Sequence, residues 1–303
     1  MLRIAFENSK KGIIFAILAP LFYALKSSTV KLALPIKVEQ LWFLRLIFDI
    51  IILSPLFFRN RKCFSSRHLF LHFFRAALVT FLSFISVYMI RKLALTDVIL
   101  LESSFPLFIP LVLWIWHRKK ITLYSWIILL LGFLSIFFLT KLRLDYGYMA
   151  SCIGLGIALL TAVALVTVNT LATTESSISI LFYYYLFSVM ITLSFCTFSW
   201  DGIPTIPAVF WLPFIFHSIF GVLFQYSVVQ AYSLIAAHYV GAFSYFAILF
   251  STLFSWLIWK ESLSGVQIIG GVLLIVLGLL IICERGKKSF LEIKPKKLKL
   301  TSF

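Results

Sequence analysis

Apolar residues gather into ten long stretches along this chain, and short polar or charged turns separate the stretches. A helix of about 20 residues crosses the roughly 30 Å hydrocarbon core of a bilayer. The pattern therefore predicts transmembrane helices over residues 12–34, 41–58, 69–90, 97–116, 121–140, 147–169, 178–198, 208–230, 239–259 and 265–283. We expect an all-α integral membrane protein with ten transmembrane helices.

The second five stretches repeat the order of features in the first five. The fourth and the ninth stretch both contain serines and end in tryptophans, at Trp116 and Trp259, and a charged turn follows each. Because five is an odd number, the second set must cross the membrane upside down, which predicts a 5+5 inverted-topology repeat. The predicted divisions are a first repeat over 1–143, a second repeat over 144–283 and a basic tail over 284–303.

Composition supports a membrane protein and argues against other classes. Hydrophobic residues make up 62% of the chain and charged residues only 13%, too little polar surface for a soluble domain. The four cysteines are scattered, without a C-x-x-C pair, so neither a metal site nor a disulfide framework is indicated. The chain contains no G-x-x-x-x-G-K-[ST] motif, and we expect neither a cofactor nor a nucleotide-driven pump. Serine, histidine and cysteine are too dispersed for a membrane-embedded enzyme.

The net charge of +16 is concentrated in particular turns and in the tail. Lysines and arginines cluster after the second and fourth stretches and beyond residue 284, so the positive-inside rule places both termini in the cytoplasm. We expect the tail to lie on anionic membrane lipid rather than to bind nucleic acid or another partner. No small-residue cleavage site follows the first apolar run, which favours an uncleaved helix over a signal peptide.

A series of short motifs carries a resemblance to a known family. In chain order they are Lys31, Phe43-Leu-Arg45, Arg75, Ser104-Phe-Pro106-Leu-Phe, Trp259-Lys-Glu261-Ser, Gly271 and Gly278. With these motifs, residues 12–283 resemble the EamA type of the drug/metabolite transporter superfamily. The resemblance implies a ten-helix carrier that works without ATP and holds its substrate midway across the bilayer. Arg118-Lys119-Lys120 stands where an acidic residue usually closes the fourth helix, so Glu261 lacks a matching acidic partner.

Ionisable residues inside the predicted helices are candidates for substrate binding, because each costs roughly 2.5–3.5 kcal/mol near mid-membrane on insertion scales. Arg45 and Asp49 lie one turn apart on one face. They either neutralise each other, or Arg45 steers a carboxylate while Asp49 offers charge to a cation or proton. Glu102 either faces a cavity in the same role or lies at the interface. Pro106 frees the backbone carbonyl one turn earlier.

Other charged residues suit gating or structural roles. Lys26 and Lys31 stand toward the outer end of the first helix, where long side chains snorkel to the headgroups. Arg75 is expected to anchor the third helix at the interface. Lys31, Arg75, Pro106 and Glu261 are therefore predicted as gating or structural residues.

The second half offers hydroxyl, amide and ring groups instead of charges. Tyr184, Tyr226 and Tyr245 are the predicted binding residues there. If these side chains form one wall of the substrate site, that aromatic wall stacks against a purine or holds an onium group by cation–π attraction. The alternative is that the tyrosines form ordinary interfacial belts, or that the 33 phenylalanines and abundant lysines and isoleucines reflect the codon bias of an A+T-rich genome. His217 is expected to be a packed, hydrogen-bonded residue rather than a proton carrier.

We therefore expect a secondary transporter that moves a small-molecule substrate, a polar metabolite, across a bacterial inner membrane by alternating access. Within the EamA type, the first half is similar to carriers of S-adenosylmethionine in obligate intracellular bacteria. That resemblance implies uptake of S-adenosylmethionine in exchange for S-adenosylhomocysteine. The alternative is an exporter of amino acids, amines or drugs, and a channel or scaffold also stays open.

Overall fold

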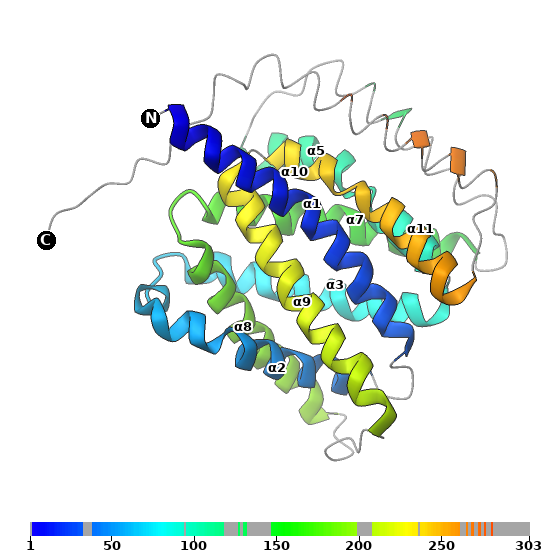
Figure 1. Ribbon diagram of the computed structural model, residues 1–303, viewed down its shortest axis with the longest axis horizontal. Helices are drawn as coiled ribbons and strands as arrows, with labels where there is room; N and C mark the ends of the chain where they lie inside the picture. Colours follow the sequence, from blue (N-terminus) through cyan, green and yellow to red (C-terminus); the bar gives the residue numbers. More distant parts are fainter. Residues whose placement is uncertain are drawn as a thin grey trace, which may run out of the picture.

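The computed structural model describes residues 2–32, 38–93, 95–117, 147–198, 208–235 and 237–260, with single residues between 127 and 280. Over these ranges every regular element is helical (Figure 1). Seven helical segments in the described part of the chain are long and apolar enough to cross a membrane. The expected all-α membrane fold is confirmed, whereas a count of ten helices extends beyond the described residues.

The helices follow the predicted stretches closely, except that the first begins at Leu2 and not near residue 12. Their bounds are α1 (Leu2–Leu32), α2 (Val38–Arg59), the short 3-10 helix η1 (Arg61–Phe64), α3 (Leu69–Lys92), α4 (Leu95–Glu102), α5 (Phe105–His117), α7 (Gly147–Leu171), α8 (Ser177–Phe198), α9 (Ala208–Leu234), α10 (Ala237–Phe243) and α11 (Phe246–Trp259). Eight of the ten predicted stretches coincide with these elements. The stretches 121–140 and 265–283 lie outside the described residues, apart from a few single positions.

The outside of the helix bundle is apolar, whereas charged groups lie within it. Phe58, Phe70 and Ile115 are 72%, 79% and 67% exposed. Large exposed apolar surfaces of this kind mark a face that contacts membrane. Arg45 and Arg75 are buried in the interior instead.

The fourth predicted stretch is two helices rather than one. Helix α4 ends at Glu102, and α5 begins at Phe105. Pro106 has no N–H to donate to the carbonyl one turn earlier, so the helical hydrogen-bond ladder is interrupted here. The Ser104 hydroxyl donates to the Leu101 carbonyl at 2.6 Å, which satisfies one of the carbonyls at the end of α4.

The ninth predicted stretch breaks at the equivalent place. Helix α10 ends at Phe243 and α11 begins at Phe246, and the Ser244 hydroxyl donates to the Gly241 carbonyl. The backbone of the two breaks is bonded alike: the N–H three residues after the serine donates to the serine carbonyl, at 3.0 Å for Ser104 and 2.9 Å for Ser244. The repeat seen in the sequence therefore extends to an irregular backbone feature.

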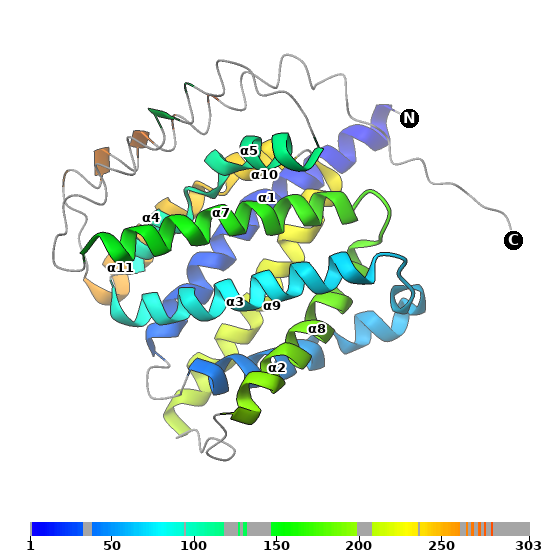
Figure 2. The ribbon, with the colours of Figure 1, turned by 180° about the vertical axis from the view of Figure 1, so that it is seen from behind.

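The packing of the helices also repeats between the two halves. Helix α1 packs along α9, and α3 packs along α7 (Figure 2). Helix α5 packs on α7 as α11 packs on α1, and α3 packs on α8 as α9 packs on α2. Each contact becomes its counterpart when α1, α2, α3 and α4–α5 are exchanged with α7, α8, α9 and α10–α11. The two halves thus form a two-repeat architecture.

The two broken helices run in opposite directions. Helix α4 packs on α11, and α5 packs on α10, so the first half of each broken helix meets the second half of the other (Figures 1 and 2). The broken helices α4–α5 and α10–α11, which correspond to each other in the two repeats, are therefore antiparallel.

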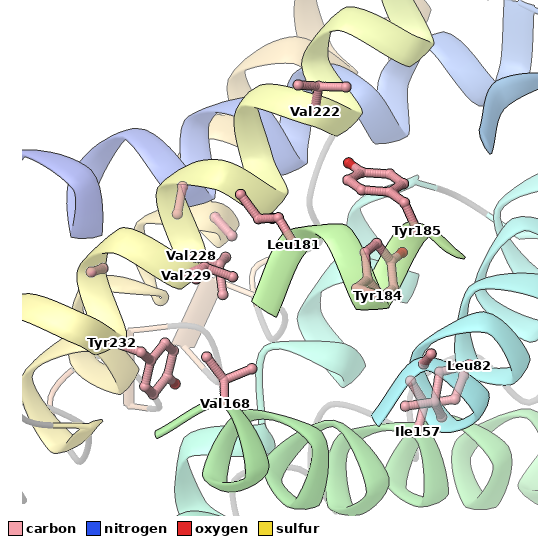
Figure 3. Close-up of a cluster of buried hydrophobic side chains, with 14 of the residues drawn as sticks. Leu82, Ile157, Val168, Leu181, Tyr184, Tyr185, Val222, Val228, Val229 and Tyr232 are labelled. Carbon is pink, nitrogen blue, oxygen red and sulfur yellow. The ribbon is translucent and has the colours of Figure 1, made fainter. Parts of the chain in front are cut away.

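The apolar core joins helices of both halves. Figure 3 shows Leu82 of α3 beside Ile157 of α7, and Tyr232 of α9 beside Val168 of α7. All four side chains are buried in one hydrophobic cluster. This core holds α3, α7 and α9 around the polar site.

Candidate functional site

A cavity of about 160 Å³ lies where the two halves meet. Helices α1, α2, α3, α7 and α9 line it, together with both helix breaks, through Ser103 in one half and Ser244 in the other. Its charged lining consists of Lys26, Arg45, Arg75 and Glu102. The cavity is therefore shared by the two repeats, and all of its described charged lining residues belong to the first.

Lys26 of α1 directs its ammonium group into this cavity. Nζ lies 5.3 Å from the ring centre of Tyr23, 5.9 Å from that of Trp42 and 5.4 Å from that of Phe224. The side chain is only 9% exposed. Its position differs from the snorkelling expected from the sequence. Three aromatic rings from α1, α2 and α9 surround the stem and attract the cation toward the protein interior.

Arg45 and Asp49 form the ion pair that their spacing allows. Arg45 Nε lies 3.3 Å from Asp49 Oδ2, and both side chains are buried. The guanidinium carbon lies 4.2 Å from the Trp42 ring centre. Arg45 lines the cavity, whereas Asp49 is not part of its wall. Asp49 therefore balances the charge of Arg45 from behind.

Gly221 makes room for this arginine, a role that sequence inspection missed. A Cβ at position 221 of α9 would collide with the Arg45 guanidinium. The guanidinium therefore lies directly against the backbone of α9. The only available signal was a lone glycine in an apolar stretch, which does not say what packs against it.

Arg75 ties three helices together at the wall of the cavity. Nη1 donates to the Ile180 carbonyl at 3.2 Å, and Nη2 donates to Gln225 Oε1 at 3.3 Å. The guanidinium lies 4.9 Å from the ring centre of Tyr184, a stacking that arginine favours. Arg75 is 2% exposed, so it lies inside the protein rather than at the interface where the sequence placed it.

Glu102 stands at the first helix break and faces the cavity. The Tyr23 hydroxyl donates to Oε2, and Oε1 has no hydrogen-bond partner within the described residues. The side chain is 8% exposed. Pro106 is buried one turn further, where Gly241 of α10 approaches it. The break therefore brings a carboxyl group to the centre of the bundle.

The three predicted tyrosines are buried or half-buried but do not line the cavity. Tyr184 lies beneath Arg75, Tyr226 packs edge-on against Phe15 with ring centres 5.8 Å apart, and Tyr245 is buried at the second break. An aromatic wall from the second half stays a prediction. The rings that surround the cavity cation come from α1, α2 and α9.

Two predicted gating residues cannot be placed. Glu261 and the side chain of Lys31 lie outside the described residues, so their roles stay predictions.

His217 is buried, with Nδ1 3.1 Å from the Lys26 carbonyl and 3.0 Å from Thr29 Oγ1. It fastens α9 to α1 beside Lys26, as expected for a packed histidine.

A helical bundle with an apolar outside, two related halves and a buried polar cavity between them is the architecture of a membrane transporter. The model of the EamA-like transporter family matches the chain twice, over residues 10–141 and 148–283. The protein belongs to the EamA-like transporter family. Because this family consists of transporters of the drug/metabolite type, the chain is a multi-pass membrane transporter rather than an enzyme.

One similar solved structure is described only as "Crystal structure of protein". It is 15% identical, the alignment covers 93% of this chain and 98% of that chain, and the TM-score is 0.66. At this identity the likeness shows the fold alone. No curated protein sequence matches this chain.

Proposed function

We propose that this protein is a secondary transporter that carries a small polar metabolite across a bacterial inner membrane by alternating access. The observation that carries the proposal is the shared cavity, which both helix breaks line. Broken helices at a repeat interface are the common substrate site of inverted-repeat transporters. The antiparallel course of α4–α5 and α10–α11 supports a 5+5 inverted repeat. The distribution of lysines and arginines supports a cytoplasmic position of both termini.

The repeated packing gives a physical route to two access states. An inverted repeat can adopt a second arrangement in which each half takes the conformation of the other. The breaks at Ser104 and Ser244 interrupt the helical ladder where α4 meets α5 and α10 meets α11. With the regular ladder interrupted, fewer backbone hydrogen bonds resist a tilt of one half-helix against the other, and such a tilt opens the cavity to one side at a time.

Our preferred substrate is S-adenosylmethionine, taken up in exchange for S-adenosylhomocysteine. Support comes from the resemblance of the Phe43-Leu-Arg45, Arg75 and Ser104-Phe-Pro106 segments to such carriers. Exchange of a substrate for its product needs neither ATP nor a coupling ion. The cavity of about 160 Å³ is smaller than the roughly 300–1,000 Å³ of ordinary ligand pockets. S-adenosylmethionine is therefore too large for the cavity as it stands, and its binding requires the two halves to separate further.

The second candidate is an exporter of amino acids, amines or drugs. The small volume of the cavity favours an amino acid or amine over a larger molecule. Export would lower intracellular pools and raise resistance to toxic analogues of the substrate.

Counterflow in proteoliposomes tests the proposal and separates its alternatives. Vesicles preloaded with S-adenosylhomocysteine should accumulate labelled S-adenosylmethionine faster than empty vesicles. Preloaded amino acid that accelerates amino-acid uptake instead would favour the second candidate. Uptake that preloading never accelerates would indicate a pore and contradict a carrier.

A further inference from the structure

The charged lining of the cavity is unbalanced toward positive charge. Lys26, Arg45 and Arg75 face it, and Glu102 is the one carboxyl group among its described lining residues. Asp49 already balances Arg45 from behind the wall. The cavity thus presents more cationic than anionic groups to whatever enters it.

We propose that the substrate carries a carboxylate and that Lys26 is the residue that binds it. This inference deepens the proposed function, on which it rests. The Lys26 ammonium has three donors, and no carboxylate of the described residues lies within ion-pair distance of it. A buried cation with no directly paired carboxylate is unfavourable, so a bound anion stabilises it.

The aromatic rings position Lys26 and do not bind the substrate's cation. Tyr23, Trp42 and Phe224 surround Nζ at 5.3–5.9 Å, so the cation–π site there is already taken by the protein's own ammonium. An onium group of a substrate cannot share it without two like charges in contact. The rings hold the ammonium at the cavity wall, where an incoming acceptor reaches it.

Arg45 adds a second donor to the same place. Its guanidinium carbon lies 4.2 Å from the Trp42 ring centre, the ring that Lys26 also contacts. Arg45 Nη1 is buried and has no hydrogen-bond acceptor within the described residues. A carboxylate has two oxygens. A carboxylate bound against Trp42 therefore accepts hydrogen bonds from both Lys26 and Arg45.

Glu102 then faces a different part of the same molecule. The Tyr23 hydroxyl donates to Glu102, while Lys26 lies against the Tyr23 ring. A carboxylate at Lys26 therefore leaves the free Oε1 of Glu102 for a cationic group of the substrate. Both S-adenosylmethionine and free amino acids have this combination of a carboxylate and an ammonium.

Matched pairs of ligands test the carboxylate directly. The probes are S-adenosylmethionine with decarboxylated S-adenosylmethionine, and methionine with its decarboxylated amine, in thermal unfolding of the purified full-length protein. One acid should raise the unfolding midpoint and its amine should not. The pair that responds identifies the source of the carboxylate. An amine that stabilises as well as its acid would overturn the proposal.

Two variants assign the effect to Lys26. Lys26→Met keeps the length of the side chain, removes its charge and should weaken binding of the acid by about tenfold or more. Lys260→Met is the matched control, because Lys260 lies 5.7 Å from the Trp256 ring centre but is exposed and does not line the cavity. Its response to the acid should equal that of the unmodified protein. Full retention of binding by Lys26→Met would refute the role of this residue.

The ligand-free protein tests the proposal even if no probe binds. Removal of an unpaired buried charge should raise the unfolding midpoint of Lys26→Met by roughly 2–4 °C. An equal or lower midpoint would mean that the rings hold the ammonium as a structural group, and the proposal would fail. Counterflow distinguishes failure of this proposal from failure of the proposed function. Equal transport of the acid and the amine would contradict the carboxylate site alone. Absence of counterflow would contradict a carrier.

Discussion

The helix breaks at Ser104 and at Ser244 repeat each other in backbone and differ in chemistry. Both interrupt a membrane-embedded helix at a serine whose hydroxyl donates back into the preceding turn. The first break carries Glu102 and Pro106, whereas the second carries the neutral Tyr245 and the small Gly241. The duplicated feature is therefore the hinge, and the charged group belongs to one copy.

The same division extends over the whole cavity. Its charged lining residues lie on α1, α2, α3 and α4, and the second half supplies neutral groups such as Phe224, Gln225 and Ser244. A symmetric motion needs similar hinges on both sides, but recognition of one asymmetric substrate does not need similar side chains. On the proposed alternating-access mechanism, the first half recognises the substrate while both halves move. Three substitutions test that division.

Arg45→Met should have the largest effect on stability. It leaves Asp49 buried without its counter-charge, which costs about 3–5 kcal/mol. The double variant Arg45→Met with Asp49→Asn removes both charges and should recover most of the loss. The free energy of unfolding of the three proteins is the measurement. A double variant as unstable as the single one would show that the pair does not act as a unit.

Glu102→Gln should have the largest effect on transport relative to stability. The amide still accepts from Tyr23 but no longer offers negative charge to the cavity. Loss of a charge-assisted hydrogen bond is worth about 1.5–3 kcal/mol, or roughly ten- to a hundredfold in the counterflow rate. Ser244→Ala at the second break should change the rate less than about threefold. Equal losses in the two variants would contradict a division of chemistry between the halves.

Gly221→Ala, a substitution in the second half, should destabilise the packing of Arg45 in the first half. The added Cβ meets the Arg45 guanidinium, and overpacking of this kind typically costs about 1–3 kcal/mol. Gly156→Ala is the matched control, because a Cβ there has nothing within 4 Å. It should be neutral or stabilise the helix by about 0.5–1 kcal/mol. Thermal unfolding distinguishes the two, and equal behaviour would show that Arg45 moves aside easily.

Hydropathy alone located the helices that the structure describes, because a bilayer requires long apolar segments. Pro106 is expected to free the backbone carbonyl one turn earlier, but both breaks fall within stretches that are predicted as single helices. The second break carries no proline, so no residue of that kind indicated it. The EamA motifs identified the family, which the match over both repeats confirms.

The direction of each charged side chain could not be predicted in this way. Lys26 and Arg75 lie near helix ends, where snorkelling is the usual outcome, but rings and carbonyls of distant helices draw both inward. Gly221 gained its meaning only from Arg45, which lies far from it in the sequence. Such contacts depend on which helices pack against each other, and the spacing of residues along one helix does not determine that packing.

Accessibility of the cavity from the two sides of the membrane is the decisive test of alternating access. The reporter is Ser244→Cys in a protein whose native cysteines have been replaced, reacted with a membrane-impermeant maleimide from the outside or the inside of oriented vesicles. Alternating access predicts labelling from both sides, in proportions that added substrate changes. Labelling from one side only, with and without substrate, would contradict a cavity that opens alternately between the two halves.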